Sequence, residues 1–144
     1  MDINIKLLNK YAKIPTRGSA AAAGLDLYAA SDEQIRVLPH DTVKVPTGIA
    51  MEIPDGYFGA IYPRSGLATK RGLRLANCVA VIDSDYRGEI LVALHNDSGH
   101  VQYVDVNERI AQLIIQPYLN VEFNQVDELT DTERGKGGFG STGT

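Results

Sequence analysis

The C-terminal segment, residues 134–144, carries the densest group of side chains suited to holding an anion. Its repeated glycines let backbone N–H groups converge on anionic oxygens without obstruction by a Cβ atom. Positive charge, hydroxyl donors and one flat apolar face come from Arg134, Lys136, Ser141, Thr142 and Phe139. The segment is not a Walker loop, because Ser141 stands where the lysine belongs and no helix is expected to follow. The pattern indicates a phosphate cradle on a terminal arm; the alternative is a disordered tail.

A second candidate lies at residues 63–66, where a strand is expected to end and a short helix to begin. Pro63 stops the strand, and Ser65 is placed to cap the helix. Arg64 would then lie beside free N–H groups, an arrangement that can grip a phosphate. The alternative is an ordinary capped helix with a solvated arginine.

The segment 81–90 combines an apolar strand with acidic and aromatic residues. It is interpreted as a hairpin, because a glycine introduces the next apolar run. Asp83 and Asp85 would face opposite sides if the strand continued, one toward a pocket and the other toward solvent or a partner such as Arg87. A carboxylate beside bound phosphates can orient and deprotonate a water molecule, and Tyr86 offers a flat face next to it. The alternative is a turn whose aspartates bond to their own backbone.

Two polar residues stand alone in apolar surroundings. Gln112 lies in a predicted strand, where a satisfied core or interface amide is the ordinary interpretation. Asp26 is flanked by leucines, and burying its charge without a partner would be costly. We therefore expect Asp26 to be paired, bound to water or close to a cation. The three histidines are scattered, and no zinc-deaminase or serine-hydrolase motif is present.

Alternating apolar residues recur along the chain and predict strands within residues 3–7, 35–37, 43–45 and 49–53. Apolar runs at 90–94 and 113–115 predict buried strands, and Pro- and Gly-containing turns separate these segments. The one plausible helix covers residues 65–71 and ends at Gly72. This pattern predicts an all-β protein, a barrel or double-sheet jelly roll.

Length and composition favour one ordinary globular domain. The chain has 144 residues, of which 44% are hydrophobic and 22% charged. Its net charge of −4 provides no overall excess of positive charge with which to bind the phosphates of a nucleic acid. No apolar run reaches membrane-spanning length, and the N-terminal sequence lacks a signal-like stretch. The single cysteine, Cys78, excludes an internal disulfide. These features predict a cytoplasmic or nuclear protein without a membrane or nucleic-acid partner.

Five blocks in the same order resemble the five motifs of the homotrimeric dUTPases, the deoxyuridine triphosphate nucleotidohydrolases. They are residues 22–27 (AAGLDL), 63–68 (PRSGLA), 81–88 (VIDSDYRG), 109–113 (RIAQL) and 134–143 (RGKGGFGSTG). The resemblance implies a jelly-roll-like distorted β-barrel over residues 1–130, with one short helix. It also implies a flexible glycine-rich arm, residues 131–144, that closes over an active site. The implied reaction is hydrolysis of dUTP to dUMP and pyrophosphate, with Mg²⁺ bound to the triphosphate and three subunits sharing their sites. Such activity would limit uracil incorporation into DNA and supply dUMP for thymidylate synthesis.

The resemblance also assigns roles to individual residues. Asp83 matches the carboxylate that activates water, and Tyr86 matches the ring that packs under the deoxyribose. Uracil would be bound by Asn77, Val81 and Ile82, with a backbone contact near Leu91. The implied phosphate contacts are Arg64, Ser65, Gly66, Gln112, Arg134, Gly140, Ser141 and Thr142. Phe139 would cover the uracil, and Asp26 would act through water near the metal.

One position departs from the family pattern: Ala80 stands where the family often has glycine, which would be unfavourable if the turn needed a positive φ. Three other interpretations remain. The chain could be a non-catalytic nucleotide sensor or protein-docking member of the same fold, a fold-related dCTP deaminase, or a purely structural trimeric β protein. An intact Asp83, Tyr86 and arm argue against the non-catalytic member, and the aligned motifs favour hydrolysis over the deaminase. A purely structural protein would have no reason to combine Arg64, Asp83, Gln112 and the C-terminal segment.

Overall fold

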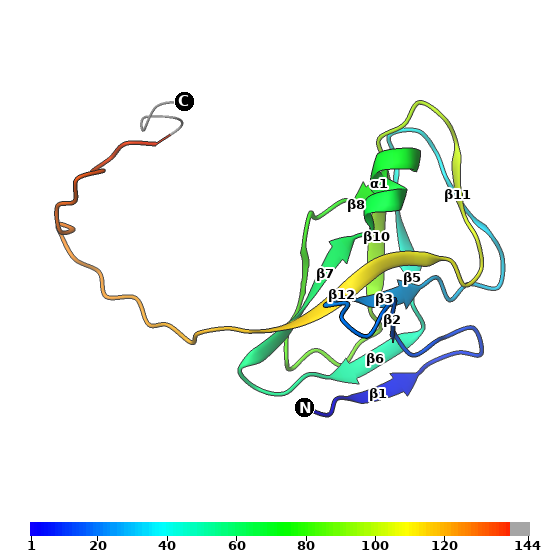
Figure 1. Cartoon of the computed structure of the whole chain (residues 1–144), viewed down its shortest axis with the longest axis horizontal. Coiled ribbons are helices and arrows are strands. Elements are labelled where there is room, and N and C mark those ends of the chain that lie inside the picture. Colours follow the sequence, from blue (N-terminus) through cyan, green and yellow to red (C-terminus); the bar gives the residue numbers. More distant parts are fainter. Residues whose placement is uncertain (139–144) are drawn as a thin grey trace.

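A computed structural model of the chain describes residues 1–138 (Figure 1). Its strands are short, as expected from the alternating sequence, and one helix interrupts them. In chain order the elements are β1 (Asn4–Leu7), β2 (Thr16–Arg17), β3 (Leu25–Tyr28), β4 (Ile35–Val37), β5 (Thr42–Pro46), β6 (Ile49–Glu52), β7 (Tyr57–Pro63), α1 (Ser65–Arg71), β8 (Leu73–Leu75), β9 (Ala80–Ile82), β10 (Leu91–Asn96), β11 (Gln102–Val104) and β12 (Arg109–Pro117). The all-β, jelly-roll-like class with one short helix is confirmed, although the described strands form open sheets and not a closed barrel.

The core lies between a five-stranded and a three-stranded sheet. The larger sheet has the order β2-β3-β12-β7-β9, the smaller one has the order β5-β10-β8, and two strand pairs, β1-β6 and β4-β11, complete the fold. The larger sheet contributes Leu27, Ile61 and Leu113 to the same buried cluster that receives Val92 and Leu94 from β10. In β10 the even-numbered residues are buried and the odd-numbered ones are more exposed, the period-2 pattern of a strand with one face on the core.

Strand β12 organises the larger sheet, because it pairs with β3 on one side and with β7 on the other. Its register places Gln112 opposite Asp26 of β3 and opposite Tyr62 of β7. The sequence blocks 22–27 and 109–113 therefore lie side by side. The block 63–68 begins at the end of β7 and so lies in the same region.

Helix α1 has the predicted bounds and ends at Gly72, which adopts the left-handed conformation with φ 68°. The predicted capping role of Ser65 is wrong. Arg64 is the N-cap residue, with extended backbone angles and no side-chain cap, and Ser65 is already helical. The Arg64 carbonyl accepts hydrogen bonds from the N–H groups of Leu67 and Ala68.

The predicted hairpin over residues 81–90 is also wrong. Strand β9 pairs with β7 in the larger sheet, whereas β10 pairs with β5 and β8 in the smaller one. The segment between them is a turn-containing connection that crosses from one sheet to the other. Ala80 begins β9 and is not among the described non-glycine residues with positive φ, so alanine is compatible with its backbone.

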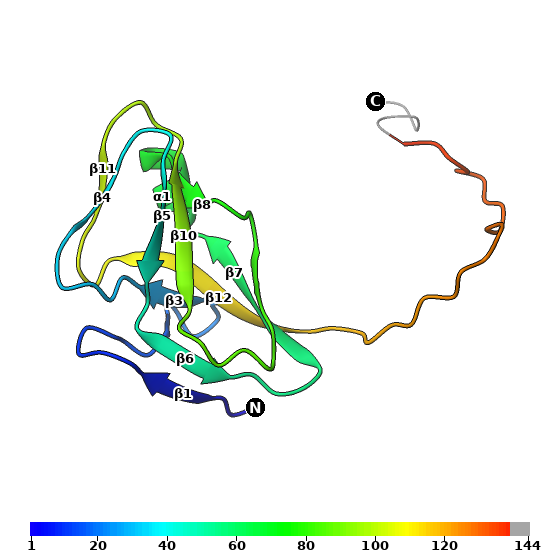
Figure 2. The same cartoon turned by 180° about the vertical axis from the view of Figure 1, so that it is seen from behind.

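Tyr118 still contacts the body through a 3.0 Å hydrogen bond from its N–H to the Gly56 carbonyl. Beyond it the chain leaves the sheets, and both views show residues 119–138 extending away from them (Figures 1 and 2). Three large apolar side chains of this segment are almost fully exposed: Leu119 at 86%, Phe123 at 94% and Leu129 at 88%. In residues 1–138 we find no helix that is both long and apolar enough to span a membrane.

Candidate functional site

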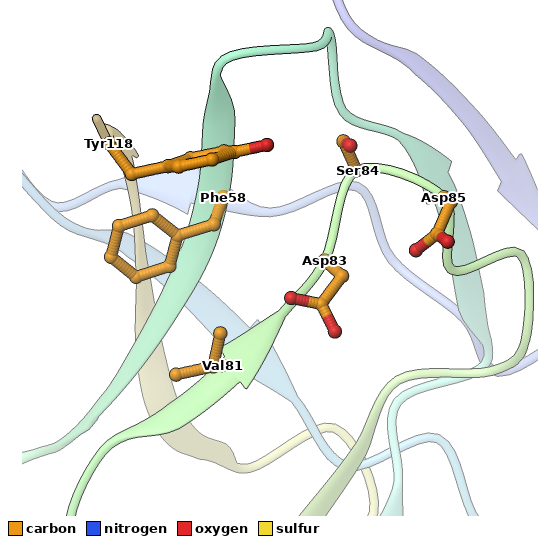
Figure 3. Close-up of a pocket in the computed structure, with 6 residues that line it drawn as sticks. All are labelled: Phe58, Val81, Asp83, Ser84, Asp85 and Tyr118. Atoms are coloured by element: carbon orange, nitrogen blue, oxygen red, sulfur yellow. The ribbon is translucent and has the colours of Figure 1, made fainter. Parts of the chain in front are cut away.

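The end of β9 and the turn after it line two adjoining pockets that share Val81 and Asp83. The first, shown in Figure 3, is lined by Phe58, Val81, Asp83, Ser84, Asp85 and Tyr118. The second has a volume of about 320 Å³ and is lined by Lys44, Asn77, Ala80, Val81, Ile82, Asp83, Tyr86, Glu89, Ile90, Leu91 and Ala93. We call the second one the Asp83 pocket. It is lined by every residue assigned to uracil, deoxyribose and water activation by resemblance except Phe139, which lies outside the described residues.

Asp83 and Asp85 do not face opposite sides, because strand β9 ends at Ile82 and its alternation ends with it. Both carboxylates line the pocket of Figure 3, where Asp83 lies between the aromatic rings of Phe58 and Tyr118 and the carboxylate of Asp85. Asp83 thus stands at the boundary of both pockets.

Arg87 does not pair with either of these acids in the described structure. Its guanidinium lies 3.9 Å from the Glu52 carboxylate and donates a 2.6 Å hydrogen bond to the Ser84 carbonyl. That bond closes the turn on which Asp83 stands.

The ring of Tyr86 is held by the residues that follow it. Its hydroxyl donates a 2.9 Å hydrogen bond to the Glu89 carbonyl, and the Glu89 carboxylate accepts one of 2.8 Å from the Gly48 N–H. A Cβ atom at Gly88 would lie 2.6 Å from the ring carbon Cζ of Tyr86, which is closer than real Cβ contacts allow. Gly88 therefore gives the tyrosine ring the space it occupies.

Strands β8 and β10 position Asn77 at the other side of the Asp83 pocket. Arg74 of β8 is opposite His95 of β10, and Arg74 forms an ion pair with Asp97 just beyond β10. The side-chain hydrogen bond from Arg74 lowers the pKa of Asp97 below its ordinary value. Cys78, next to Asn77, carries the positive φ of 56° that turns the chain toward β9.

A separate pocket, which we call the Arg64 pocket, lies where β3, β12 and the end of β7 meet. It is lined by Gly18, Ala22, Ala23, Gly24, Asp26, Arg64, Ser65, Gly66, Arg109, Gln112 and Ile114. Backbone N–H groups, hydroxyl, amide and guanidinium groups together make this a surface suited to phosphate.

The sequence predicts that Asp26 is paired, bound to water or close to a cation, and it is paired with two arginines. Its two carboxylate oxygens lie 3.1 Å from Arg64 Nε and 3.2 Å from Arg109 Nη1. Gln112 donates a 3.0 Å hydrogen bond to the Pro63 carbonyl, so its amide is satisfied as expected. A Cβ atom at Gly24 would lie 2.6 Å from Gln112 Oε1, so glycine is needed for this close approach.

The sequence-predicted residues thus fall into two groups, because no residue lines both the Asp83 pocket and the Arg64 pocket. Arg134 belongs to neither: it is exposed on the C-terminal segment, where its Nε donates to the Gly137 carbonyl at 2.9 Å. Four predicted residues, Phe139, Gly140, Ser141 and Thr142, lie outside the described residues.

Sequence reasoning assigned no role to Arg109, Phe58 or Tyr118. Arg109 belongs to a quoted motif, and the expectation that Asp26 has a cationic partner was the signal that could have identified it. Phe58 and Tyr118 gave no such signal, because their rings meet only through pairing of β7 with β12 and pack edge to face 6.5 Å apart.

Within residues 1–138, no group of three or more His, Cys, Asp or Glu side chains is arranged to hold a metal ion. A divalent cation at either pocket would therefore take most of its ligands from a bound molecule or from water. This fits a metal carried by a polyphosphate.

Comparison with known proteins agrees with this geometry. The sequence profile of the dUTPase family matches residues 10–143. A deoxyuridine 5'-triphosphate nucleotidohydrolase of Desulfitobacterium hafniense strain DCB-2 is 49% identical over 136 residues, which cover 94% of this chain and 90% of that protein. Its counterpart in Nautilia profundicola is 48% identical over 143 residues, 99% of both chains. The chain therefore belongs to the dUTPase family.

Solved structures give the same result at the level of the fold. The dUTPase of Staphylococcus bacteriophage 80alpha with dUpNHpp superposes with a TM-score of 0.91, 29% identity and 99% coverage of both chains. Variants of that enzyme with dUpNHpp include an aspartate changed to asparagine and a tyrosine three positions later changed to phenylalanine. A further structural match is a variant of the dUTPase from Staphylococcus aureus phage phi11 with one aspartate changed to asparagine, in which a structural Mg(II) ion is coordinated; its TM-score is 0.83 at 24% identity, over 91% of this chain and 100% of that one.

Proposed function

We propose that this protein hydrolyses dUTP to dUMP and pyrophosphate. The observation that carries the proposal is the position of Asp83 in a pocket with Tyr86 and Asn77, on a chain of the dUTPase family. The aspartate and tyrosine substituted in the bacteriophage 80alpha enzyme have the same three-residue spacing as Asp83 and Tyr86.

The Asp83 pocket would bind the deoxyuridine part of the substrate. Asn77 and the backbone of Val81, Ile82 and the Leu91 region offer hydrogen-bonding groups for the edge of uracil. The Tyr86 ring would pack against the deoxyribose. A 2′-hydroxyl placed against that ring would be left without a partner, at a cost of about 1–3 kcal/mol, which supports selection of deoxyribose.

Asp83 would act as the general base. Its carboxylate takes a proton from a water molecule, the water oxygen attacks the α-phosphorus, and the bond from that phosphorus to the bridging oxygen breaks to release pyrophosphate. Phosphoryl transfer needs mainly positioning and stabilisation of charge, so no covalent nucleophile is required.

The phosphates would be bound by Arg64, Ser65, Gly66 and Gln112 of the Arg64 pocket. Since this pocket shares no residue with the Asp83 pocket, we propose a homotrimer in which the two pockets of one site come from different subunits. The exposed apolar side chains of residues 118–129 support an assembly, because a second copy would remove them from water.

The arm, residues 131–144, would close over the site from a further subunit. Arg134, Gly140, Ser141 and Thr142 would hold phosphate, and Phe139 would cover the uracil. The separation of residues 119–138 from the body supports a role for the arm beyond its own subunit.

Mg²⁺ would be held mainly by the substrate triphosphate, with Asp26 in reach only through water. When bound, the ion supplies positive charge that offsets the charge developing on the phosphate oxygens. We also place the enzyme in the cytoplasm, with the nucleus as the alternative, where it would keep uracil out of DNA and provide dUMP.

The test is pyrophosphate release from dUTP, dTTP, dCTP and UTP, each with Mg²⁺ and with a chelator. The expected result is metal-dependent release from dUTP alone. Release from all four would contradict the roles of β9 and Tyr86, and dUTP binding without release would favour the nucleotide-sensing alternative.

A further inference from the structure

Asp26 is the buried member of a trio of charged residues in the Arg64 pocket. Its side chain is 12% exposed, whereas the side chains of Arg64 and Arg109 are 30% and 50% exposed. Each carboxylate oxygen of Asp26 is engaged by a different guanidinium, at 3.1 Å and 3.2 Å. Both oxygens are therefore directed at arginines.

The backbone brings the trio together through strand pairing. Asp26 lies on β3, Arg109 begins β12, and Arg64 follows β7, so the three residues come from neighbouring strands of one sheet. A further hydrogen bond of 3.3 Å runs from Arg64 Nη1 to the Arg109 carbonyl. Arg64 is thus held at two points of its guanidinium, at Nε and at Nη1.

We propose that Asp26 is a positioning residue, which acts by orienting Arg64 and Arg109 toward the triphosphate. The inference rests on the proposed function. The physical argument starts from the negative charge of Asp26, which has the same sign as the charge of the phosphates. A carboxylate in an anion-binding pocket weakens the overall attraction for phosphate, so its benefit must come from geometry. A displacement of about 1 Å in a positioning group costs roughly 100-fold in rate, which is enough to outweigh that penalty.

The decisive variant is Asp26→Asn, which keeps the size of the side chain and removes its negative charge. We expect kcat for dUTP to fall by about tenfold or more, while KM changes by less than about threefold. Binding of inorganic pyrophosphate in the presence of a chelator, measured by titration calorimetry, should be as tight as in the wild type or tighter. Weaker pyrophosphate binding together with a lower kcat would overturn the proposal, since it would indicate general damage to the pocket.

A double-mutant cycle on kcat/KM tests whether Asp26 acts through the arginine. In an Arg64→Ala background, Asp26→Asn should cost less than it costs in the wild type. An equal loss in both backgrounds would overturn the proposal. Asp32→Asn removes an exposed carboxylate and serves as the matched control, with unchanged kinetics and pyrophosphate binding.

Titration of Mg²⁺ separates this role from one exerted through the metal. If Asp26 orients the arginines, the Mg²⁺ concentration for half-maximal rate stays the same and excess Mg²⁺ does not restore kcat. Recovery of kcat at high Mg²⁺ would overturn the proposal. If the wild type released no pyrophosphate from dUTP, the proposed function would fail, while calorimetry with pyrophosphate would still report on the pocket.

Discussion

Gly88 controls the position of the Tyr86 ring, because a Cβ atom there would overlap the ring. Gly88→Ala should therefore displace the ring, lower kcat/KM for dUTP and reduce the preference for dUTP over UTP by about tenfold. Steady-state kinetics with both nucleotides measure the ratio. Gly99→Ala is the matched control, since nothing lies within 4 Å of a Cβ atom at Gly99. An unchanged ratio in Gly88→Ala would contradict selection by the ring.

Substitution of Asp83 tests whether this residue is the general base. Asp83→Asn keeps the shape of the side chain but removes the base, so kcat should fall by about 10²–10⁴-fold while dUTP binding is retained. Single-turnover rates and calorimetric binding of a non-hydrolysable dUTP analogue measure the two effects. Full activity in this variant would exclude Asp83 as the base.

The elements that hold these residues were only partly predictable from the sequence. Alternation located β1, β4, β5 and β6, apolar runs located β10 and β12, and Pro63 and Gly72 marked the two ends of the segment that contains α1, because those signals are local. They could not show that β9 pairs with β7, since pairing between distant strands depends on the whole fold. The same limit applies to Asp26: its need for a cation could be read from its leucine neighbours, but the identity of both arginines required the register of β12.

At the scale of the elements, Arg71 is predicted to stabilise the attachment of helix α1 to the segments around β11. Arg71 in the last turn of the helix reaches Glu108 at 2.5 Å and Gln102 at 3.3 Å, and also donates to the Tyr103 carbonyl. Arg71→Met should lower the free energy of unfolding by about 1–3 kcal/mol, because partly buried acceptors lose their donor. For a chain of this size, each kcal/mol corresponds to a drop in Tm of roughly 2–4 °C. Lys70→Met, an exposed neighbour, is the control for thermal unfolding, and equal Tm values would contradict this role.

At the scale of the whole molecule, the C-terminal segment contains two parts with different expected roles. Truncation after Thr130 removes only the proposed arm, so it should reduce kcat/KM strongly and leave the number of subunits in the oligomer unchanged. Truncation after Pro117 also removes Leu119, Phe123 and Leu129 and should weaken the assembly. Light scattering and activity assays separate the two, and loss of the oligomer in the shorter deletion would contradict a purely covering arm.

The separation of the Asp83 and Arg64 pockets has a consequence for inheritance. If each site takes one pocket from each of two subunits, an inactive Asp83→Asn subunit and an inactive Arg64→Ala subunit can assemble into a mixed oligomer that contains one intact pair of pockets. Two defective alleles of this one gene would then complement each other when expressed together. Substitutions within the same pocket would fail to do so, and the chain would divide into two complementation groups along the boundary between its pockets.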